Sequence, residues 1–282
     1  MQFGISLPNY GDAITPLLLC EAAKAAEEAG WDGIFLWDHI LVSKNQGHNM
    51  VDPWVALGAM AAVTERIRLG TTVTPIARRR PWKLARETVT LDHLSGGRLT
   101  LSVGLGAPEK AEFGLLGETT SKRIRAEKLD EGLEILMGLW SGKAFEFHGK
   151  HFQLSKVTFK PGPIQKPRIP IWVGGYSSRK APFRRAARFD GAFPLKSHGE
   201  ITAKDLRDIQ ELIDTQRKSD DPYDLVSMGS LLDEPPTSQE RKLTYLAATW
   251  LTWWLESLFQ LRSDGNALLT AIRLGPPGRD RL

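Results

Sequence analysis

Short apolar runs alternate with amphipathic stretches along most of this chain. A short apolar run bounded by glycine or proline is typical of a buried strand, and apolar residues at three- and four-residue spacing indicate a helix. Eight runs are each followed by a stretch with helical spacing. The predicted strands are residues 3–7, 33–37, 67–73, 99–103, 171–173, 192–193, 225–228 and 252–255, of which 192–193 and 225–228 have the weakest pattern.

Residues 66–106 show this repeating unit most clearly. Strand-like residues up to Val73 are followed by Pro81, which suits the first position of a helix, and Ser95-Gly96-Gly97 ends that helix before the next strand. Parallel strands need such crossovers and are buried on both faces. Eight repeats therefore predict a single (β/α)₈ TIM barrel rather than an open doubly wound sheet.

One segment departs from the repeat after the predicted helix at 125–140. Phe-Glu-Phe and His-Phe-Gln-Leu flank His148-Gly149-Lys150, which indicates a small hairpin, and prolines between 161 and 170 indicate an extended connector. We expect one domain over residues 1–282, with an insertion at about 141–168.

Composition narrows the functional classes. The length of 282 residues suits one barrel, and a net charge of +4 slightly favours anionic ligands without the clustered charge of a nucleic-acid-binding protein. A single cysteine excludes an internal disulfide framework, and no leader or 18-residue apolar run is seen, so we expect a cytoplasmic protein without a membrane span. A homodimer is compatible with this composition.

Chemistry in a barrel belongs at the carboxyl ends of the strands. Those ends have few pairs of nucleophile and base, and they lack the lysine or paired carboxylates that a cofactor-free lyase or hydrolase needs. Glycines in two of the loops let backbone N–H groups approach an anion or a flat ring, which favours a bound cofactor. The residues at these ends are Asn9, Tyr10, Asp38, His39, Thr72 to Pro75, Gly104, Gly106, Gly174, Gly175 and Glu256.

At these positions the chain resembles the bacterial luciferase-like oxidoreductases, which depend on flavin or deazaflavin. The matching segments are Trp37-Asp38-His39, Asp52-Pro53-Trp54, residues 66–75, residues 91–98, Val103-Gly104-Leu105-Gly106, residues 139–142 and residues 170–175. The resemblance implies that the barrel binds reduced FMN or reduced F420, that residues 145–168 cover part of the site, and that a small organic substrate is oxygenated or reduced. Because Glu109 stands where a dinucleotide fingerprint needs its third glycine, we expect a separate reductase or dehydrogenase to supply the reduced cofactor.

The resemblance also suggests roles for individual residues. Asp38 and His39 match the catalytic pair, in which His39 either donates a proton beside the ring or only orients it. Thr72 and Val73 match a bulge that backs the ring, which implies a non-proline cis peptide between them; the competing account is an ordinary trans strand end. Gly104, Gly106, Gly174 and Gly175 either contact the cofactor through the backbone or form tight turns. Asn9, Tyr10 and Arg78 are the candidates for substrate binding.

Other features have less specific interpretations. The run Arg78-Arg79-Arg80 is either solvated or sends one arginine to the cofactor tail or substrate. His148 and His151 lack further ligands for a metal, so we expect no metal site. Trp250, Trp253 and Trp254 suggest core packing, although many relatives have glycine at the position of Trp250. A flavin-binding protein without turnover and a cofactor-free barrel lyase or hydrolase are the alternative functions.

Overall fold

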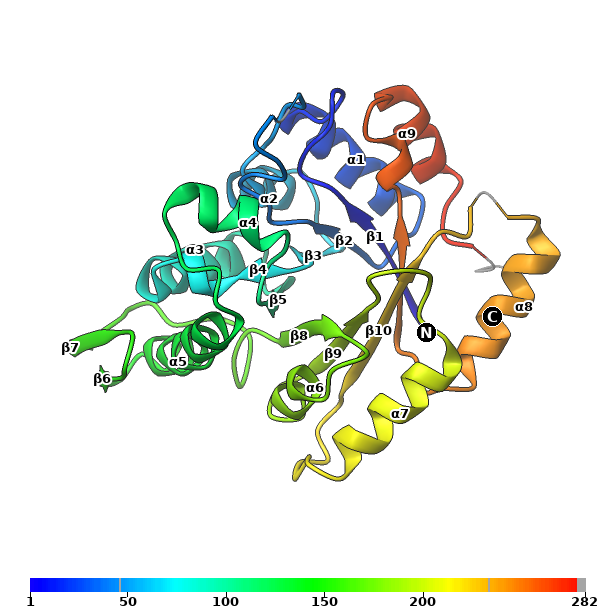
Figure 1. The fold of residues 1–282 in the computed structure, drawn as a ribbon. Coiled ribbons are helices and arrows are strands. Elements are labelled where there is room, and N and C mark those ends of the chain that lie inside the picture. Colours follow the sequence, from blue (N-terminus) through cyan, green and yellow to red (C-terminus); the bar gives the residue numbers. More distant parts are fainter. Residues whose placement is uncertain (46, 233, 278–282) are drawn as a thin grey trace.

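The computed structural model describes residues 1–45, 47–232 and 234–277, and it contains a closed parallel barrel (Figure 1). The strands follow one another in the order β3-β2-β1-β11-β10-β9-β8-β5-β4, and a further pairing of β3 with β5 closes the ring. β3 and β4 share one position because both pair with β5, so the barrel has eight positions. The strands are β1 Gln2–Leu7, β2 Gly33–Leu36, β3 Arg68–Thr71, β4 Thr74–Pro75, β5 Leu99–Gly104, β8 Ile171–Tyr176, β9 Gly191–Leu195, β10 Asp224–Gly229 and β11 Trp253–Ser257.

The predicted strand-helix alternation is confirmed for all eight repeats, including the two with the weakest pattern. The major helices are α1 Pro16–Glu28, α2 Pro53–Ala62, α3 Pro81–Leu94, α5 Lys122–Trp140, α6 Ala181–Ala186, α7 Ala203–Asp214, α8 Pro236–Ala247 and α9 Gly265–Arg273. Several begin as their sequences dictate. Thr15 and Asp52 cap α1 and α2 ahead of a proline, and Thr202 forms a capping box with Asp205 at α7. The sequence did not predict the short helices α4 Glu109–Glu112 and η3 Phe259–Leu261. With four and three residues, they are too short to show a repeating apolar pattern.

Aromatic side chains fill the barrel interior. Phe35, Trp172 and Trp253 contact one another inside the ring, with centroid separations of 5.1 to 5.7 Å. Trp172 donates a hydrogen bond from Nε1 to Asp224 Oδ2 at 2.9 Å, and burial raises the pKa of Asp224. The interior below the mouth is therefore a packed core, and a ligand has to bind above it.

The insertion forms the predicted antiparallel hairpin. β6 Ala144–His148 pairs with β7 Gln153–Thr158, and Figure 1 shows the hairpin projecting from the barrel beside α5. Its turn is bound to α5, because Glu131 accepts hydrogen bonds from the backbone N–H groups of Lys150 and Phe152. Trp82 of α3 contacts Phe152 edge to face. The hairpin thus lies against the outer helices, and the expected cover over the site is not seen among the described residues.

Trp250 does not pack in the core as expected. Trp253 and Trp254 are buried, but the Trp250 side chain is 77% exposed and its backbone has a left-handed φ of 63°. Such a φ is costly for a residue with a Cβ and favours glycine.

Trp250→Gly should therefore raise the free energy of unfolding by about 0.5 to 1 kcal/mol, since relief of the left-handed backbone exceeds the added entropy of the unfolded chain. Urea unfolding measures the change. Trp250→Ala serves as the control, because alanine has the same penalty as tryptophan for a left-handed backbone. An equal gain in stability in both variants would show that the effect comes from removal of the indole.

Candidate functional site

A histidine and a buried carboxylate meet at the barrel mouth. His39 follows β2, and Glu112 comes from the short helix α4 after β5. His39 Nδ1 lies 2.9 Å from Glu112 Oε1, and the Glu112 side chain is only 1% exposed. The same oxygen accepts hydrogen bonds from the backbone N–H groups of Ile40 at 3.1 Å and Leu41 at 3.3 Å.

These contacts assign the tautomer of His39. A carboxylate oxygen that already accepts two N–H bonds is an acceptor, so Nδ1 of the neutral ring carries the proton and donates it to Glu112. Nε2 then presents its lone pair. It has no hydrogen-bond partner within residues 1–45, 47–232 and 234–277, and the His39 side chain remains 19% exposed. The arrangement can therefore take a proton from a ligand or return one.

Asp38 lies in a buried network of charges. Its carboxylate contacts Arg78 Nη2 at 2.8 Å and Arg79 Nη2 at 2.7 Å, and Trp54 Nε1 donates to it at 3.2 Å. Burial alone would raise the pKa of Asp38, but the charges of Arg79 and Arg78 outweigh burial and hold the pKa below its usual range. Asp38 is thus an anion at neutral pH, which suits a positioning role better than the catalytic role expected for it.

Arg78 connects this network to the histidine. Its Nε lies 3.1 Å from Glu112 Oε2, although without the alignment of a hydrogen bond, and its side chain is 7% exposed. The arginine run is therefore not a solvated segment: Arg78 and Arg79 point inward and only Arg80 is exposed. Because the Arg78 guanidinium contacts Asp38 and Glu112, its position favours a structural role over the substrate contact expected for it.

Asn9 is also engaged inside the protein. Its fully buried amide donates to the carbonyl oxygens of His39 and Val51, both at 2.8 Å, and its Oδ1 accepts from the backbone N–H of His39 at 3.1 Å. Asn9 therefore clamps the backbone of His39, and its side chain has no group left for the substrate contact that we expected.

Tyr10 remains at the mouth as part of an aromatic wall that comprises Tyr10, Trp37 and Phe259. Trp37 stacks on Phe259 with centroids 5.3 Å apart, and Tyr10 lies edge-on to the His39 ring at 5.6 Å. Trp37 is fixed by a 2.9 Å hydrogen bond from Nε1 to Ser6 Oγ. This wall gives the mouth a flat apolar side next to the histidine.

The backbone between Thr72 and Val73 confirms the expectation of a non-proline cis peptide. The Val73 side chain fits between two of the candidate glycines. A Cβ on Gly104 would lie 2.7 Å from Val73 Cγ2, and a Cβ on Gly174 would lie 2.6 Å from Val73 Cγ1. Glycine is thus required at both positions by the valine itself.

Contacts within the protein also explain why the other two candidate positions are glycine. Gly106 has a φ of +78°, and a Cβ there would lie 2.8 Å from Pro75 Cβ. A Cβ on Gly175 would collide with the ring of Pro182. Packing and turn geometry therefore account for all four candidate glycines, as expected if they form tight turns. Backbone contact between these glycines and a cofactor stays a prediction.

Gly104→Ala and Gly174→Ala should each lower the free energy of unfolding by about 1 to 3 kcal/mol through overpacking against Val73. Much of the loss should disappear when Val73→Ala removes both methyl groups, giving a favourable coupling in a double-mutant cycle followed by urea unfolding. Gly58→Ala on α2, where a Cβ meets nothing within 4 Å, is the control. Additive losses would show that Val73 is not the reason for the glycines.

A hollow of about 270 Å³ lies at the carboxyl ends of β9, β10 and β11, on the other side of the mouth from β3. Its charged groups are already paired: Lys196 lies 2.6 Å from Asp205, and Glu200 lies 2.7 Å from Lys242. Small polar and apolar groups complete the lining, namely Leu195, Met228, Ser230, Ser257 and Gln260. The hollow therefore suits a small uncharged molecule. A larger hollow of about 510 Å³ lies outside the barrel between α1 and α9, away from these groups.

The remaining candidate residues have structural partners. Glu256 accepts hydrogen bonds from the backbone of Leu231 at 2.7 Å and Leu232 at 3.0 Å, which ties the loop after β10 to β11. His151 contacts Glu127, and His148 contacts Gln153.

Across the described residues, no group of three or more His, Cys, Asp or Glu side chains is arranged to hold a metal ion. Within the same ranges, no helix has the length and apolar character needed to cross a membrane.

The mouth as a whole fits a flat redox ring. The partly buried Val73 and the aromatic wall supply apolar contact, whereas the buried hydroxyl of Ser6 is engaged by Trp37 Nε1 and by the Thr72 hydroxyl 3.4 Å away. His39 Nε2 supplies one group able to move a proton. Glu112 was missed by sequence reasoning, because a glutamate in a four-residue helix gives no periodic signal and its partner lies 73 residues away.

Comparisons with known proteins show the family of this chain. The model of a family described as luciferase-like monooxygenase matches residues 1–267. An F420-dependent glucose-6-phosphate dehydrogenase from Nakamurella multipartita is 33% identical over 182 residues, which cover 63% of this chain and 51% of that protein. The chain therefore matches about half the length of that relative.

Two solved structures share the fold. The coenzyme F420-dependent tetrahydromethanopterin reductase from Methanopyrus kandleri has a TM-score of 0.75 at 19% identity, covering 97% of this chain and 96% of that one. The oxygenating constituent of 3,6-diketocamphane monooxygenase from Pseudomonas putida, in complex with FMN, has a TM-score of 0.75 at 14% identity, covering 100% and 99%. At these identities the likeness shows the barrel architecture alone.

Proposed function

Because the chain belongs to the luciferase-like monooxygenase family, we propose that it is an oxidoreductase that binds F420 or FMN at the barrel mouth, with F420 preferred. The preference rests on the Nakamurella relative, whose printed name is that of an F420-dependent dehydrogenase. The observation that carries the proposal is the pairing of His39 Nδ1 with Glu112 Oε1, which leaves Nε2 as an open acceptor beside the Tyr10 ring at the barrel mouth.

F420, when bound, accepts or returns a hydride at ring carbon five. The chain has to supply the proton half of that reaction. As a C–H bond of an alcohol gives up its hydride, His39 Nε2 takes the hydroxyl proton, and Glu112 stabilises the imidazolium through Nδ1. In the reverse direction the same nitrogen protonates the carbonyl oxygen. Asp38, Arg78 and Asn9 hold His39 in place and exchange no proton.

The substrate fits the hollow at β9 to β11, opposite the bulge. Since Lys196 and Lys242 are already paired with carboxylates, we propose a small neutral alcohol or carbonyl compound. Glucose 6-phosphate, the substrate in the relative's name, carries a phosphate that these paired cations would not readily neutralise. A separate reductase or dehydrogenase would restore the cofactor, because Glu109 replaces the third glycine of a nicotinamide fingerprint.

Titration of the purified chain with F420, FMN and NADPH tests the proposal. We expect saturable binding of F420, weaker binding of FMN and none of NADPH, together with cofactor reduction by a neutral alcohol in the absence of oxygen. Binding of FMN alone, with turnover only in oxygen, would reassign the enzyme as a monooxygenase. Binding of NADPH alone would refute the cofactor assignment.

A further inference from the structure

Four exposed cations follow β8 without acidic partners. Residues 176–188 contain five basic residues and no acidic one. Arg185 forms a two-pronged contact with Asp130 of α5, at 2.5 and 2.8 Å. In the described part of the chain no carboxylate lies within 4.0 Å of the other four, which we call the basic stripe: Arg179, Lys180, Arg184 and Arg188.

The basic stripe runs along the short helix α6: Arg179 and Lys180 precede it, Arg184 lies in it and Arg188 is in the turn that follows it. Lys180, Arg184 and Arg188 are four residues apart, and Arg184 N donates to Lys180 O at 3.0 Å as in a helix. Residues joined by such a bond are neighbours on the helix surface, so the like charges of Lys180 and Arg184 repel each other.

Elsewhere the chain uses the same spacing for opposite charges. Lys83 pairs with Glu87 on α3 at 2.7 Å, and Lys204 pairs with Asp208 on α7 at 2.5 Å. Like charges at this spacing on α5, Glu127 and Glu131, are both contacted by the hairpin turn. The basic stripe has no such partner among the described residues, and an anion from outside the chain would relieve its repulsion.

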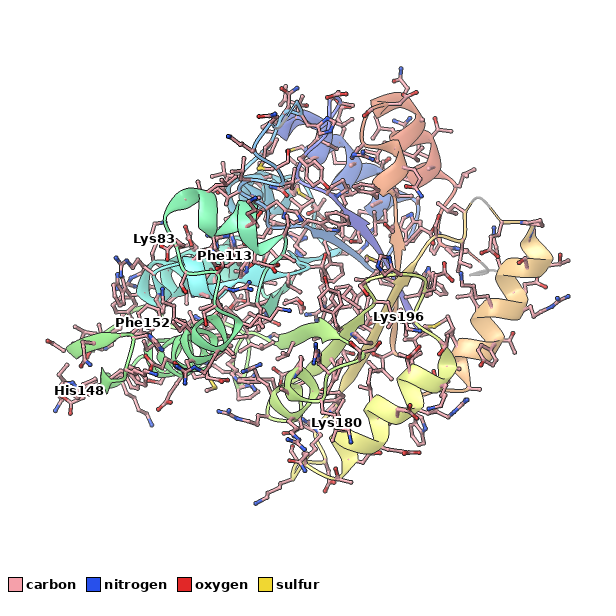
Figure 2. The ribbon with its side chains drawn as sticks, in the orientation of Figure 1. Lys83, Phe113, His148, Phe152, Lys180 and Lys196 are labelled. Carbon is pink, nitrogen blue, oxygen red and sulfur yellow. The ribbon has the colours of Figure 1, made fainter. Side chains whose placement is uncertain are left out.

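The basic stripe begins next to the proposed cofactor site. Gly174 contacts Val73 at the mouth, and the strand continues to Ser177, whose N–H donates to Leu195 O at 2.9 Å just before Arg179. Figure 2 shows Lys180 at the periphery beside α6 and Lys196 nearer the barrel axis. Because the four cations are spread from the residues before α6 to the turn after it, they can contact several anionic groups in series.

We propose, on the basis of the function inferred above, that the basic stripe binds the oligo-γ-glutamyl tail of F420. The ribityl chain of that cofactor carries a phosphate, a lactyl group and then successive glutamates, each with a free carboxylate. With the ring at the mouth, the tail leaves over the β8 loop and follows α6. FMN ends at a single phosphate, so the basic stripe distinguishes the two cofactors.

Binding is measured by fluorescence titration with two probes, F420 with several glutamates and the form that ends at the lactyl group. Arg184→Gln/Arg188→Gln should weaken binding of the glutamate-bearing probe roughly 2- to 30-fold, as expected for two exposed ion pairs, and the loss should shrink with added salt. Binding of the glutamate-free probe should not change. Lys24→Gln/Arg241→Gln, which removes two exposed charges from α1 and α8, is the matched control and should behave as wild type.

The outcomes separate the two proposals. If wild type binds neither probe, the cofactor assignment itself fails. If wild type binds both probes equally, or if the α6 variant weakens both equally, the tail does not contact the basic stripe and this inference is overturned while the cofactor assignment stands. An equal loss of affinity in the control variant would show that the effect comes from the net charge of the protein, and would also overturn the inference.

Discussion

His39→Ala is expected to lower kcat by roughly 10²- to 10⁴-fold, the range for loss of a positioned acid or base. The free energy of unfolding and cofactor affinity should change little, because the ring is 19% exposed and Asn9 holds the loop through backbone atoms. Steady-state kinetics on a neutral alcohol, with cofactor affinity measured separately, distinguish a catalytic loss from a binding loss.

Glu112→Gln provides a graded comparison. The amide keeps an oxygen that can accept from His39 Nδ1 but lacks the charge that stabilises the imidazolium, so kcat should fall less than in His39→Ala. The pH dependence of kcat should shift as well, which a purely structural role would not produce. Unchanged turnover in His39→Ala would make His39 an orienting residue and would remove the proton-transfer role.

Asp38→Ala should lower the free energy of unfolding by about 3 to 5 kcal/mol, because removal of one partner leaves buried charges uncompensated. Arg78 and Arg79, with side chains 7% and 15% exposed, would lose the carboxylate that both contact. Urea unfolding measures the loss. Asp208→Asn, which breaks an exposed pair on α7, is the control and should cost less than about 1 kcal/mol.

The pH dependence of stability provides a second measurement of Asp38. Its pKa in the folded protein is below the ordinary value of 3.8, so its contribution is complete above that value and is lost as pH falls toward the lower folded pKa. The stability difference between wild type and Asp38→Ala should therefore narrow in acid. A difference that stays constant from neutral pH to below pH 3.8 would show that the carboxylate charge is not what stabilises the network.

The strands and helices could be predicted because each is specified locally. Runs such as residues 99–103 and stops such as Ser95-Gly96-Gly97 lie within one element, and their alternation is enough to indicate a barrel. The cis peptide at Thr72 could be predicted only from family resemblance, since nothing in the local pattern requires it.

The chemistry of the mouth could be predicted only in part because it depends on long-range contacts. His39 was found from its place after a strand, but Glu112 joins it from 73 residues away. Asp38 and Asn9 occupy strand ends as expected, yet folding turns both side chains inward, toward partners about 40 and 30 residues distant. Position in a repeat therefore locates a residue at the mouth without deciding which way its side chain faces.

A crystal structure of the chain with F420 would test the central claim most directly. The account predicts that the ring lies against the Thr72–Val73 peptide, with its reactive edge about 3 to 3.5 Å from a substrate or water that also contacts His39 Nε2. A ring bound over β9 to β11, or in the outer hollow between α1 and α9, would contradict it.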